Sequence, residues 1–286
     1  MVKLSGLVCA HDEEDRLAAC LERLWFCDQV VVVADRCTDR TEEIARQYGA
    51  TVVSGAFPLE GLRKHAGLAA CTGQWVFEVD CDERVSTPLG HEVRAVLLGE
   101  PAGDWFQVPV DNYVGERLVR HGWGGSFGTS LVVRLYRREA KRWKSDRVHP
   151  GVTMDGTLAG RLTGTIAHLV DDDIGDMFAR LNRYTGLKAQ DLADKTLRGE
   201  GRLRSLGSDV FRGFRRFFKC YVSRKGYREG EYGFLIALMA ALYPVMSTLR
   251  AREILATRRD AAAPVLLHPL PLLPALPQPM PARRAA

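Results

Sequence analysis

The sequence lacks the features of several common classes of protein. Its seven cysteines form no C-x-x-C pair and no zinc-ligand spacing, and an odd number leaves no complete set of disulfides, which favours a reducing cytoplasm. The chain enters a strand pattern at once, without the charged and apolar regions of a signal peptide, so we expect the main domain to stay inside the cell. No internal repeat is visible.

Motifs of other nucleotide-binding and nucleic-acid-binding proteins are also missing. No G-x-G-x-x-G follows the first predicted strand, which argues against an oxidoreductase that uses a dinucleotide. No glycine-rich phosphate loop with Lys or Arg follows that strand either, which argues against a nucleotidyltransferase. The chain has no helix-turn-helix, zinc-finger or RNA-binding signature, so we expect no nucleic-acid partner.

Positive charge is concentrated late in the chain. The 286 residues have a net charge of +5, but residues 1–197 carry 24 Lys and Arg against 29 Asp and Glu. Residues 198–260 carry 14 Lys and Arg against 6 acids, a net charge of +8, and Arg283 and Arg284 add the last two charges. A basic segment of this kind suits an anionic partner.

Hydrophobic periodicity predicts a sheet with crossover helices. Through about residue 100, short apolar runs alternate with segments whose apolar residues recur at helical spacing, which is typical of an α/β protein with a largely parallel sheet. Asp39, and Ser86 or Thr87, are placed to cap helices. The predicted strands are residues 3–9, 29–34, 51–54, 75–80, 105–110 and 130–136, and the predicted helices are residues 14–24, 39–48, 62–71, 88–98 and 171–198.

Two acids separated by one residue follow the apolar run 75–79. Asp80 and Asp82 come where the strand ends, and carboxylate oxygens are ligands that suit Mg²⁺ and Mn²⁺. An earlier strand also ends in an acid, Asp35. Because α/β sheets bind nucleotides in the crevice at the carboxyl ends of their strands, this pattern predicts a divalent cation site for chemistry on a diphosphate.

The last third of the chain differs in kind from the rest. Residues 210–221 interleave aromatic residues with Arg and Lys, and residues 233–249 form an uncharged apolar run that contains Pro244. The apolar run is short for a membrane span, and two interpretations stay open: an interfacial helix lying on anionic lipid, and a helical pair packed on the main domain. Residues 261–286 are rich in Ala, Pro and Leu, and we predict a disordered tail there.

Several motifs are distributed along most of the chain. They are residues 4–9, 12–14, 31–35, 38–41, Lys64, 73–75, 80–85, 134–138, 148–150, 182–184 and 224–234. Together these motifs resemble those of family 2 inverting glycosyltransferases of the GT-A fold, and in particular the bacterial branch that contains lipopolysaccharide core β-glucosyltransferases. The resemblance covers about residues 2–255.

The resemblance implies a division of the chain into three parts. Residues 1–170 would form a GT-A, Rossmann-like nucleotide-sugar domain with a mostly parallel mixed sheet, its nucleotide half at about residues 1–100 and its acceptor half at about residues 101–170. Residues 171–260 would form a helical, basic and aromatic region that associates with a membrane surface. The tail, residues 261–286, would follow.

The resemblance also implies which residues hold a UDP-sugar. Asp80 and Asp82 would touch the ribose and a Mg or Mn ion, with Asp82 as the more direct ligand. Lys64, together with Arg63, would place positive charge near the diphosphate. The remaining donor-binding positions, for the base and ribose, are Cys9, Ala10, His11, Glu13 and Asp35.

The catalytic base is the least defined part of the resemblance. Inversion by direct displacement needs a general base for the acceptor hydroxyl. Many relatives carry an aspartate where this chain has residues 124–130, and an acid where it has Pro150. The first candidates in this chain are Asp146 and His149, and Asp111 is a further candidate ranked after them.

The acceptor site has two candidate residues. His121 and Trp123 lie in a glycine-rich loop and are candidates to line it, because an aromatic face stacks on a sugar ring, but both could equally pack the loop.

The hypothesis from the sequence is an enzyme that transfers a hexose, with glucose as the best guess, from a UDP-sugar with inversion to a lipid-linked or lipopolysaccharide-core acceptor. It would be a cytoplasmic protein, peripheral on the inner face of the cytoplasmic membrane, touching anionic lipid through residues 210–255. The alternatives are a sugar-nucleotide nucleotidyltransferase and a non-catalytic, membrane-associated module that binds nucleotide sugars.

Overall fold

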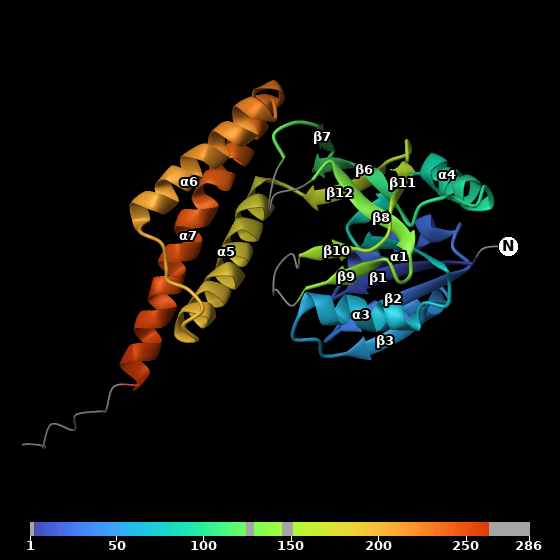
Figure 1. Cartoon of the computed structure of the whole chain (residues 1–286), viewed down its shortest axis with the longest axis horizontal. Helices are drawn as coiled ribbons and strands as arrows, with labels where there is room; N and C mark the ends of the chain where they lie inside the picture. The colour runs from blue at the N-terminus through green and yellow to red at the C-terminus, as the bar shows by residue number, and fades with distance from the viewer. Residues whose placement is uncertain (1–2, 124–128, 145–150, 263–286) are drawn as a thin grey trace, which may run out of the picture.

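A ten-stranded mixed sheet lies at the centre of the computed structural model, which describes residues 3–123, 129–144 and 151–262. The strand order is β3-β2-β1-β4-β8-β6-β12-β5, with β7 and β11 each paired to β6, and β9 and β10 form a separate pair (Figure 1). The strands are β1 (Leu4–Ala10), β2 (Gln29–Asp35), β3 (Thr51–Gly55), β4 (Trp75–Asp80), β5 (Glu83–Val85), β6 (Trp105–Val114), β7 (Arg117–Val119), β8 (Leu131–Arg137), β9 (Lys141–Trp143), β10 (Val152–Met154), β11 (Leu158–Arg161) and β12 (Ile166–Asp171).

The prediction of a mostly parallel mixed sheet is confirmed. β3, β2, β1 and β4 run parallel, and β1, β2 and β4 are largely buried because helices cover both faces. β8 lies antiparallel between β4 and β6, which makes the sheet mixed. The predicted strand 105–110 is too short, since the alternation of buried and half-buried residues in β6 continues to Val114.

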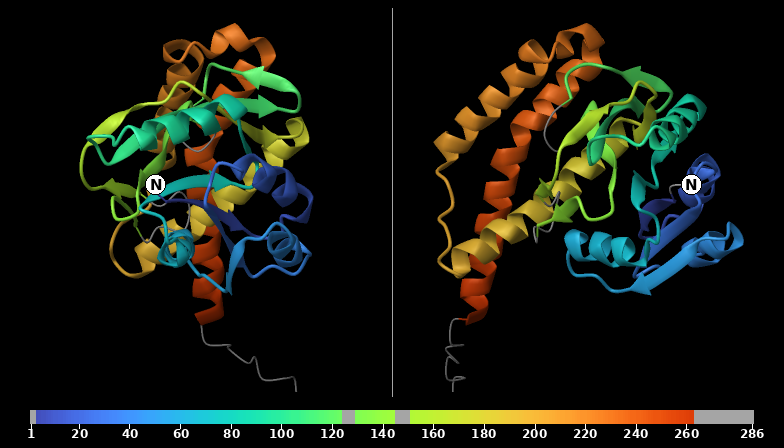
Figure 2. Two further views of the ribbon diagram at one scale, coloured as in Figure 1. Left: turned by 90° about the vertical axis from the view of Figure 1, so that its right-hand side faces the viewer. Right: turned by 45° about the vertical axis from the view of Figure 1, so that its right-hand side comes forward.

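Helices on both faces of the sheet create two apolar cores (Figure 2). One core lies under α1 and α4 and includes Leu17, Phe77 and Leu89. The other lies on the α3 side and includes Leu7 and Tyr136. The helices in this part of the chain are α1 (Glu14–Leu21), which continues as a 3-10 turn (Glu22–Leu24), α2 (Thr41–Gln47), α3 (Glu60–Ala70) and α4 (Thr87–Leu98).

One of the predicted helix caps is present. The Ser86 hydroxyl accepts a hydrogen bond from the Leu89 backbone N–H at the start of α4, so Ser86 rather than Thr87 is the cap. This cap satisfies a backbone donor that the helix itself leaves unpaired. Asp39 is not the N-cap of α2, because that position is Arg40, whose side chain makes no capping hydrogen bond; Asp39 lies one residue earlier and accepts a hydrogen bond from the Thr41 backbone N–H at 3.0 Å.

Three helices form the C-terminal region and share a core of their own. This core includes Met177 of α5 and Ile236 of α7, and it reaches Val114 and Val170 at the ends of β6 and β12. The packed-helix interpretation is therefore present in the structure, while contact with lipid stays a prediction. The helices are α5 (Ile174–Leu197), α6 (Leu206–Phe218) and α7 (Gly230–Ala262), and α6 and α7 are joined by a π-helical turn (Lys219–Ser223) and a 3-10 turn (Gly226–Glu229).

By length and composition, one helical segment, Gly226–Arg258, could cross a membrane. Half of its most apolar window is buried inside the protein. This property is shared by core helices of soluble proteins, so it does not by itself identify a membrane span. The predicted tail at residues 261–286 begins within the last two residues of α7, and the rest of it lies outside the described residues.

Gly213 sets how closely α6 approaches α7. A Cβ added there would lie 2.5 Å from the backbone oxygen of Ala241, and a backbone atom yields less readily than a side chain. We expect Gly213→Ala to lower the free energy of unfolding by about 1–3 kcal/mol, measured by urea denaturation. Gly207→Ala is the control: its Cβ would meet nothing within 4 Å, so this variant should be neutral or up to about 1 kcal/mol more stable. Equal stability of the two variants would contradict the packing described.

Candidate active site

The register of the parallel strands brings the predicted donor-binding residues to one edge of the sheet. Cys9 of β1 lies beside Val33 of β2 on one side and beside Asp80 of β4 on the other. Asp35 therefore ends its strand at nearly the same level as Asp80. This is the crevice at the carboxyl ends of the strands, where α/β sheets bind nucleotides.

A pocket of about 330 Å³ opens beside Asp80 and Asp82. Its walls come from the turn after β4, from β6, β8 and β12, from the start of α1, and from α5 of the C-terminal region. The helical region therefore contributes directly to the pocket. The charged and titratable residues that line it are Glu13, Arg16, Asp80, Asp82, Glu83, Arg134, His168, Arg180, Arg183 and Tyr184.

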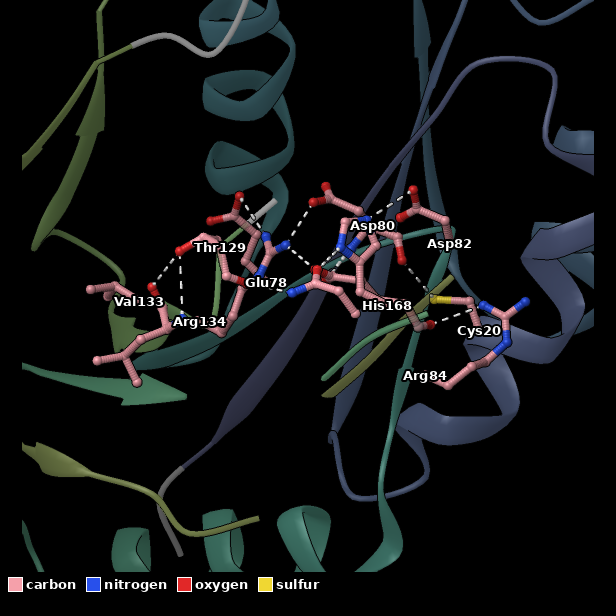
Figure 3. A network of polar contacts seen from close by, with 12 residues as sticks. Cys20, Glu78, Asp80, Asp82, Arg84, Thr129, Val133, Arg134 and His168 are labelled. Atoms are coloured by element: carbon pink, nitrogen blue, oxygen red, sulfur yellow. Dashed lines mark hydrogen bonds and ion pairs between the residues drawn. The ribbon is translucent and has the colours of Figure 1, made fainter. Parts of the chain in front are cut away.

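Asp80 is held by positive charge (Figure 3). The Nη2 group of Arg134 donates a hydrogen bond to Asp80 Oδ2 at 2.7 Å and also contacts Glu83. Lys64 Nζ lies 3.6 Å from Asp80 Oδ1. Burial would raise the pKa of Asp80, but the positive charges of Arg134 and Lys64 outweigh burial and hold that pKa well below its usual range. Asp80 is therefore a carboxylate whose charge is already largely compensated.

A buried ionic cluster supports the pocket from below. Glu78 of β4 accepts hydrogen bonds from Lys64 at 2.6 Å, from Lys141, and from the Tyr136 hydroxyl at 3.0 Å. Burial would raise the pKa of Glu78, but Lys141, Lys64 and Arg134 outweigh it and lower the pKa to about 2. The cluster is ionised and nearly balanced in charge, as buried charges need to be.

The cluster corrects the predicted role of Lys64. Its ammonium is buried against Glu78, and it does not line the pocket. Its nearest partners are Glu78, beneath the pocket, and Asp80, which lines it, so Lys64 positions these two carboxylates from below the pocket. Arg63 lies 3.9 Å from Asp35, also outside the pocket lining.

Asp82 and His168 form the part of the pocket best suited to a cation. His168 Nε2 of β12 lies 3.3 Å from Asp82 Oδ2, and its Nδ1 lies 2.9 Å from Asn112 Oδ1. The Asn112 amide nitrogen donates to the Thr129 carbonyl, so its oxygen faces the ring and accepts from Nδ1–H. Burial would lower the pKa of His168, but its contact with Asp82 outweighs burial and raises that pKa, so a cation bound here would take the place of a proton on Nε2.

One oxygen of Asp82 has no partner among the described residues. Asp82 Oδ1 is buried and makes no hydrogen bond within this part of the chain, whereas a buried carboxylate oxygen ordinarily has at least one. An oxygen of this kind beside an imidazole nitrogen fits a divalent cation. Asp82 and His168 are thus the residues suited to hold such a cation, with Asp80 next to them but engaged by Arg134.

The pocket also has positive charge that is suited to an anionic ligand. Arg180 is committed to Asp171 through two hydrogen bonds of 2.9 and 2.7 Å, and Arg16 lies 3.0 Å from Asp172. Arg183 is exposed and stacks on the Tyr184 ring at 5.3 Å. Among the described residues, no carboxylate lies within 4.0 Å of the Arg183 guanidinium. Arg183 is therefore available to a phosphate oxygen.

Several predicted donor residues lie near this pocket without lining it. Asp35 is buried, and its carboxylate accepts two hydrogen bonds from Arg36 and one from the Phe57 backbone N–H. His11 Nδ1 lies 2.6 Å from the Asp35 carbonyl oxygen. The donor residues that do line the pocket are Glu13, Asp80 and Asp82, and those that do not are Cys9, Ala10, His11, Asp35 and Lys64.

The structure corrects the acceptor interpretation of Trp123. Its ring is buried in the core of the C-terminal helices, and its Nε1–H donates to the Val119 carbonyl. The packing alternative therefore holds for this residue. The His121 backbone N–H donates to Glu229 at 2.9 Å, which ties this loop to the start of α7, and His121 does not line the pocket.

The structure describes one of the three candidate bases. Asp146 and His149 lie outside the described residues, and both stay predictions. Asp111 lies on the opposite face of β6 from Val110 and Asn112, which face the pocket and His168, because side chains alternate along a strand. Asp111 is therefore turned away from the pocket.

Comparison with known proteins shows which protein family the chain resembles. A model of glycosyl transferase family 2 matches residues 5–152. The lipopolysaccharide core biosynthesis glycosyltransferase LpsC of Rhizobium meliloti is 25% identical over 260 residues, which are 86% of this chain and 91% of that protein. An uncharacterized glycosyltransferase of Rickettsia prowazekii is 29% identical over 205 residues, 67% of this chain and 68% of that one.

Among solved structures, S. aureus TarS in complex with UDP is similar over 91% of this chain and 92% of that one, with 13% identity and a TM-score of 0.44. The family model covers more than half of the sequence. The chain belongs to glycosyl transferase family 2, and its Rossmann-like α/β sheet is a GT-A fold.

Proposed function

We propose that the protein transfers a hexose from a UDP-sugar, with inversion, to a lipid-linked or lipopolysaccharide-core acceptor, and that the hexose is glucose. The observation that carries the proposal is the unpartnered, buried oxygen of Asp82 beside His168, in a pocket that also presents Arg183. Cation ligands and an exposed guanidinium in one pocket at the carboxyl edge of the sheet suit a nucleoside diphosphate.

The residues of the pocket have separable roles in this proposal. Asp82, His168 and, next to them, Asp80 would hold a Mg or Mn ion. Such a cation, when bound, supplies positive charge to the diphosphate leaving group, so the protein need not protonate it. Arg134 keeps Asp80 ionised and in place, and Arg183 would bind a phosphate oxygen. Asp146 or His149 would take the proton of the acceptor hydroxyl.

The nature of the acceptor is supported by the relative LpsC, whose name assigns it to lipopolysaccharide core biosynthesis. The division into a GT-A domain at 1–170, a helical region at 171–260 and a tail at 261–286 belongs to the same proposal. So does the location, a cytoplasmic protein peripheral on the inner face of the cytoplasmic membrane that touches anionic lipid through residues 210–255.

Thermal unfolding in the presence of candidate donors tests the proposal. UDP-, GDP- and TDP-sugars are compared, each with and without Mn²⁺. A ligand that binds only the folded state adds RT ln(1 + [L]/Kd) to stability, about 2.7 kcal/mol at a hundredfold excess over Kd. We expect UDP-sugars to raise the unfolding temperature most, and only when Mn²⁺ is present. The proposal would be contradicted if no UDP-sugar raised the unfolding temperature. It would also be contradicted if the protein released pyrophosphate from UTP and a sugar phosphate.

A further inference from the structure

The helix α6 exposes a stripe of large apolar side chains. The helix α6 lies against α7, on the side of α7 that faces away from the sheet (Figures 1 and 2). At about 100° per residue, Val210, Phe211, Phe214 and Phe218 fall within about one third of the helix circumference. Between 48% and 62% of each of these residues is exposed. The side of α6 that contains Gly213 already faces α7, so this stripe is apolar surface beyond what the packing of the helix uses.

The stripe continues onto α7 as one aromatic patch. The ring centroids of Phe214 and Phe218 are 4.7 Å apart, and those of Phe218 and Phe217 are 6.2 Å apart. Phe217 in turn lies 5.7 Å from Phe234 in the first turns of α7, and 48% of Phe234 is exposed. Contiguous exposed apolar surface of this kind marks a site of interaction.

A cationic hollow borders the aromatic patch. Residues 206–228 carry seven Lys and Arg against one acid, Asp209, which is buried and pairs with Arg212 at 3.2 Å. Within the described part of the chain, no carboxylate lies within 4.0 Å of the charged groups of Arg215 or Lys219. The hollow has a volume of about 530 Å³ and is lined by Arg212, Arg215, Arg216, Phe218, Lys219 and Ser223.

We propose that this surface, the aromatic patch together with the cationic hollow, docks the protein on an anionic lipid bilayer. α6 would lie in the plane of the headgroups, with its phenyl rings at the acyl boundary and lipid phosphates in the hollow. Phenyl rings have no polar atoms, and among the described residues no acid pairs with Arg215 or Lys219 beside them. The surface therefore matches the order of layers in a bilayer, which is apolar within and anionic outside.

The proposal assigns the membrane contact to α6 and the first turns of α7, and keeps the rest of α7 in the protein. Ile236, Ala237 and Met239 of α7 are fully buried, and half of the apolar window of this helix is covered. The inference deepens the membrane contact of the proposed function, and rests on it for the lipid character of the acceptor. It narrows that contact from residues 210–255 to one face of α6 and the start of α7.

Flotation of the full-length protein with lipid vesicles tests the docking surface. Phosphatidylcholine vesicles with and without phosphatidylglycerol are compared, with no donor or acceptor present. We expect Phe214→Ser/Phe218→Ser to lose binding to both kinds of vesicle. Arg215→Gln/Lys219→Gln should lose about thirtyfold in partitioning to anionic vesicles, since each base near such a surface contributes about fivefold, and should bind neutral vesicles as the unmodified protein does.

Matched controls lie outside the docking surface. Leu98→Ser, at a residue of α4 that is 70% exposed, and Arg23→Gln, at an exposed residue, should bind as the unmodified protein does. The unfolding temperature of every variant is measured, so that loss of fold is recognised.

Three results would overturn the docking proposal: no flotation of the unmodified protein, equal binding to neutral and anionic vesicles, or unchanged binding of both double variants. Flotation as expected without any binding of UDP would contradict the proposed function and leave the docking surface standing. Sugar transfer by a protein that does not float with vesicles would contradict the docking surface and leave the proposed transferase activity standing.

Discussion

Asp82→Asn is expected to lower the rate of sugar transfer from a UDP-sugar about a hundredfold to a thousandfold, the range seen when one preorganised charge-stabilising group is removed. Asparagine keeps the size of the side chain but removes the negative charge beside His168. Across residues 3–123, 129–144 and 151–262, the buried oxygen of Asp82 has no hydrogen-bond partner, so this part of the fold loses no hydrogen bond at that oxygen. The measurement is initial rate against Mn²⁺ concentration.

The control for this variant is Asp15→Asn. Asp15 is an exposed acid in the first turn of α1, away from the pocket lining, and its variant should keep the full rate. His168→Gln should raise the Mn²⁺ concentration needed for half-maximal rate, because it removes the imidazole nitrogen. An Asp82→Asn protein that keeps both its rate and its Mn²⁺ dependence would show that the cation site has been misplaced.

Glu78→Gln is expected to lower the free energy of unfolding by about 3–5 kcal/mol, as removal of one partner from a buried ionic cluster does. Glutamine fills nearly the same space, but it leaves Lys64 and Lys141 buried without the acid that both contact. The measurement is urea denaturation at neutral pH. Glu43→Gln is the matched control, because Glu43 pairs with Arg40 at the surface, where such pairs contribute at most about 1 kcal/mol.

The effect of Glu78→Gln should depend on pH in a defined direction. The pKa of Glu78 is about 2 in the folded protein and near its ordinary value of 4.5 when the chain is unfolded. The unfolded state therefore binds the extra proton first, and the contribution of this carboxylate is complete above pH 4.5 and is lost as pH falls toward 2. The difference in stability between the two proteins should shrink over that interval. A difference that is the same at pH 3 and pH 7 would argue against an ionised Glu78.

The edge of the sheet could be predicted because its signals are local. The run 75–79 and the acids after it are contiguous, and parallel strands must end at one edge, so the sequence alone suffices to place Asp80, Asp82 and Asp35 together. The bounds of β4 are predicted correctly for the same reason, since Gly73 and the acids bracket a largely apolar segment.

The residues that complete the pocket could not be found in this way. His168 lies in a short strand, and its relation to Asp82 depends on the pairing of β12 with β5 and β6, which no local pattern reveals. Arg134 reaches Asp80 across the antiparallel insertion of β8. Arg183 belongs to one of the sequence motifs, but only the packing of α5 beside the sheet brings it to the pocket.

Lys64 and Trp123 depart from the ligand-facing roles considered for them, and the reason is the same for both. Residue type suggests ligand-facing roles for Lys64 and Trp123, and both are buried. An ammonium is equally suited to a phosphate and to a buried carboxylate, and an indole is equally suited to a sugar and to a helical core. The distinction depends on contacts such as those of Lys64 with Glu78, which join different elements of the fold.

We propose that Asp82 and His168 hold the cation that binds a uridine diphosphate. A crystal structure of the protein with UDP and Mn²⁺ would place the metal ion and the nucleotide. We expect the Asp82 carboxylate and His168 Nε2 as ligands of a metal ion that also contacts the diphosphate, with Arg183 near a phosphate oxygen. A nucleotide bound away from this pocket, or a metal ion held without Asp82, would contradict it.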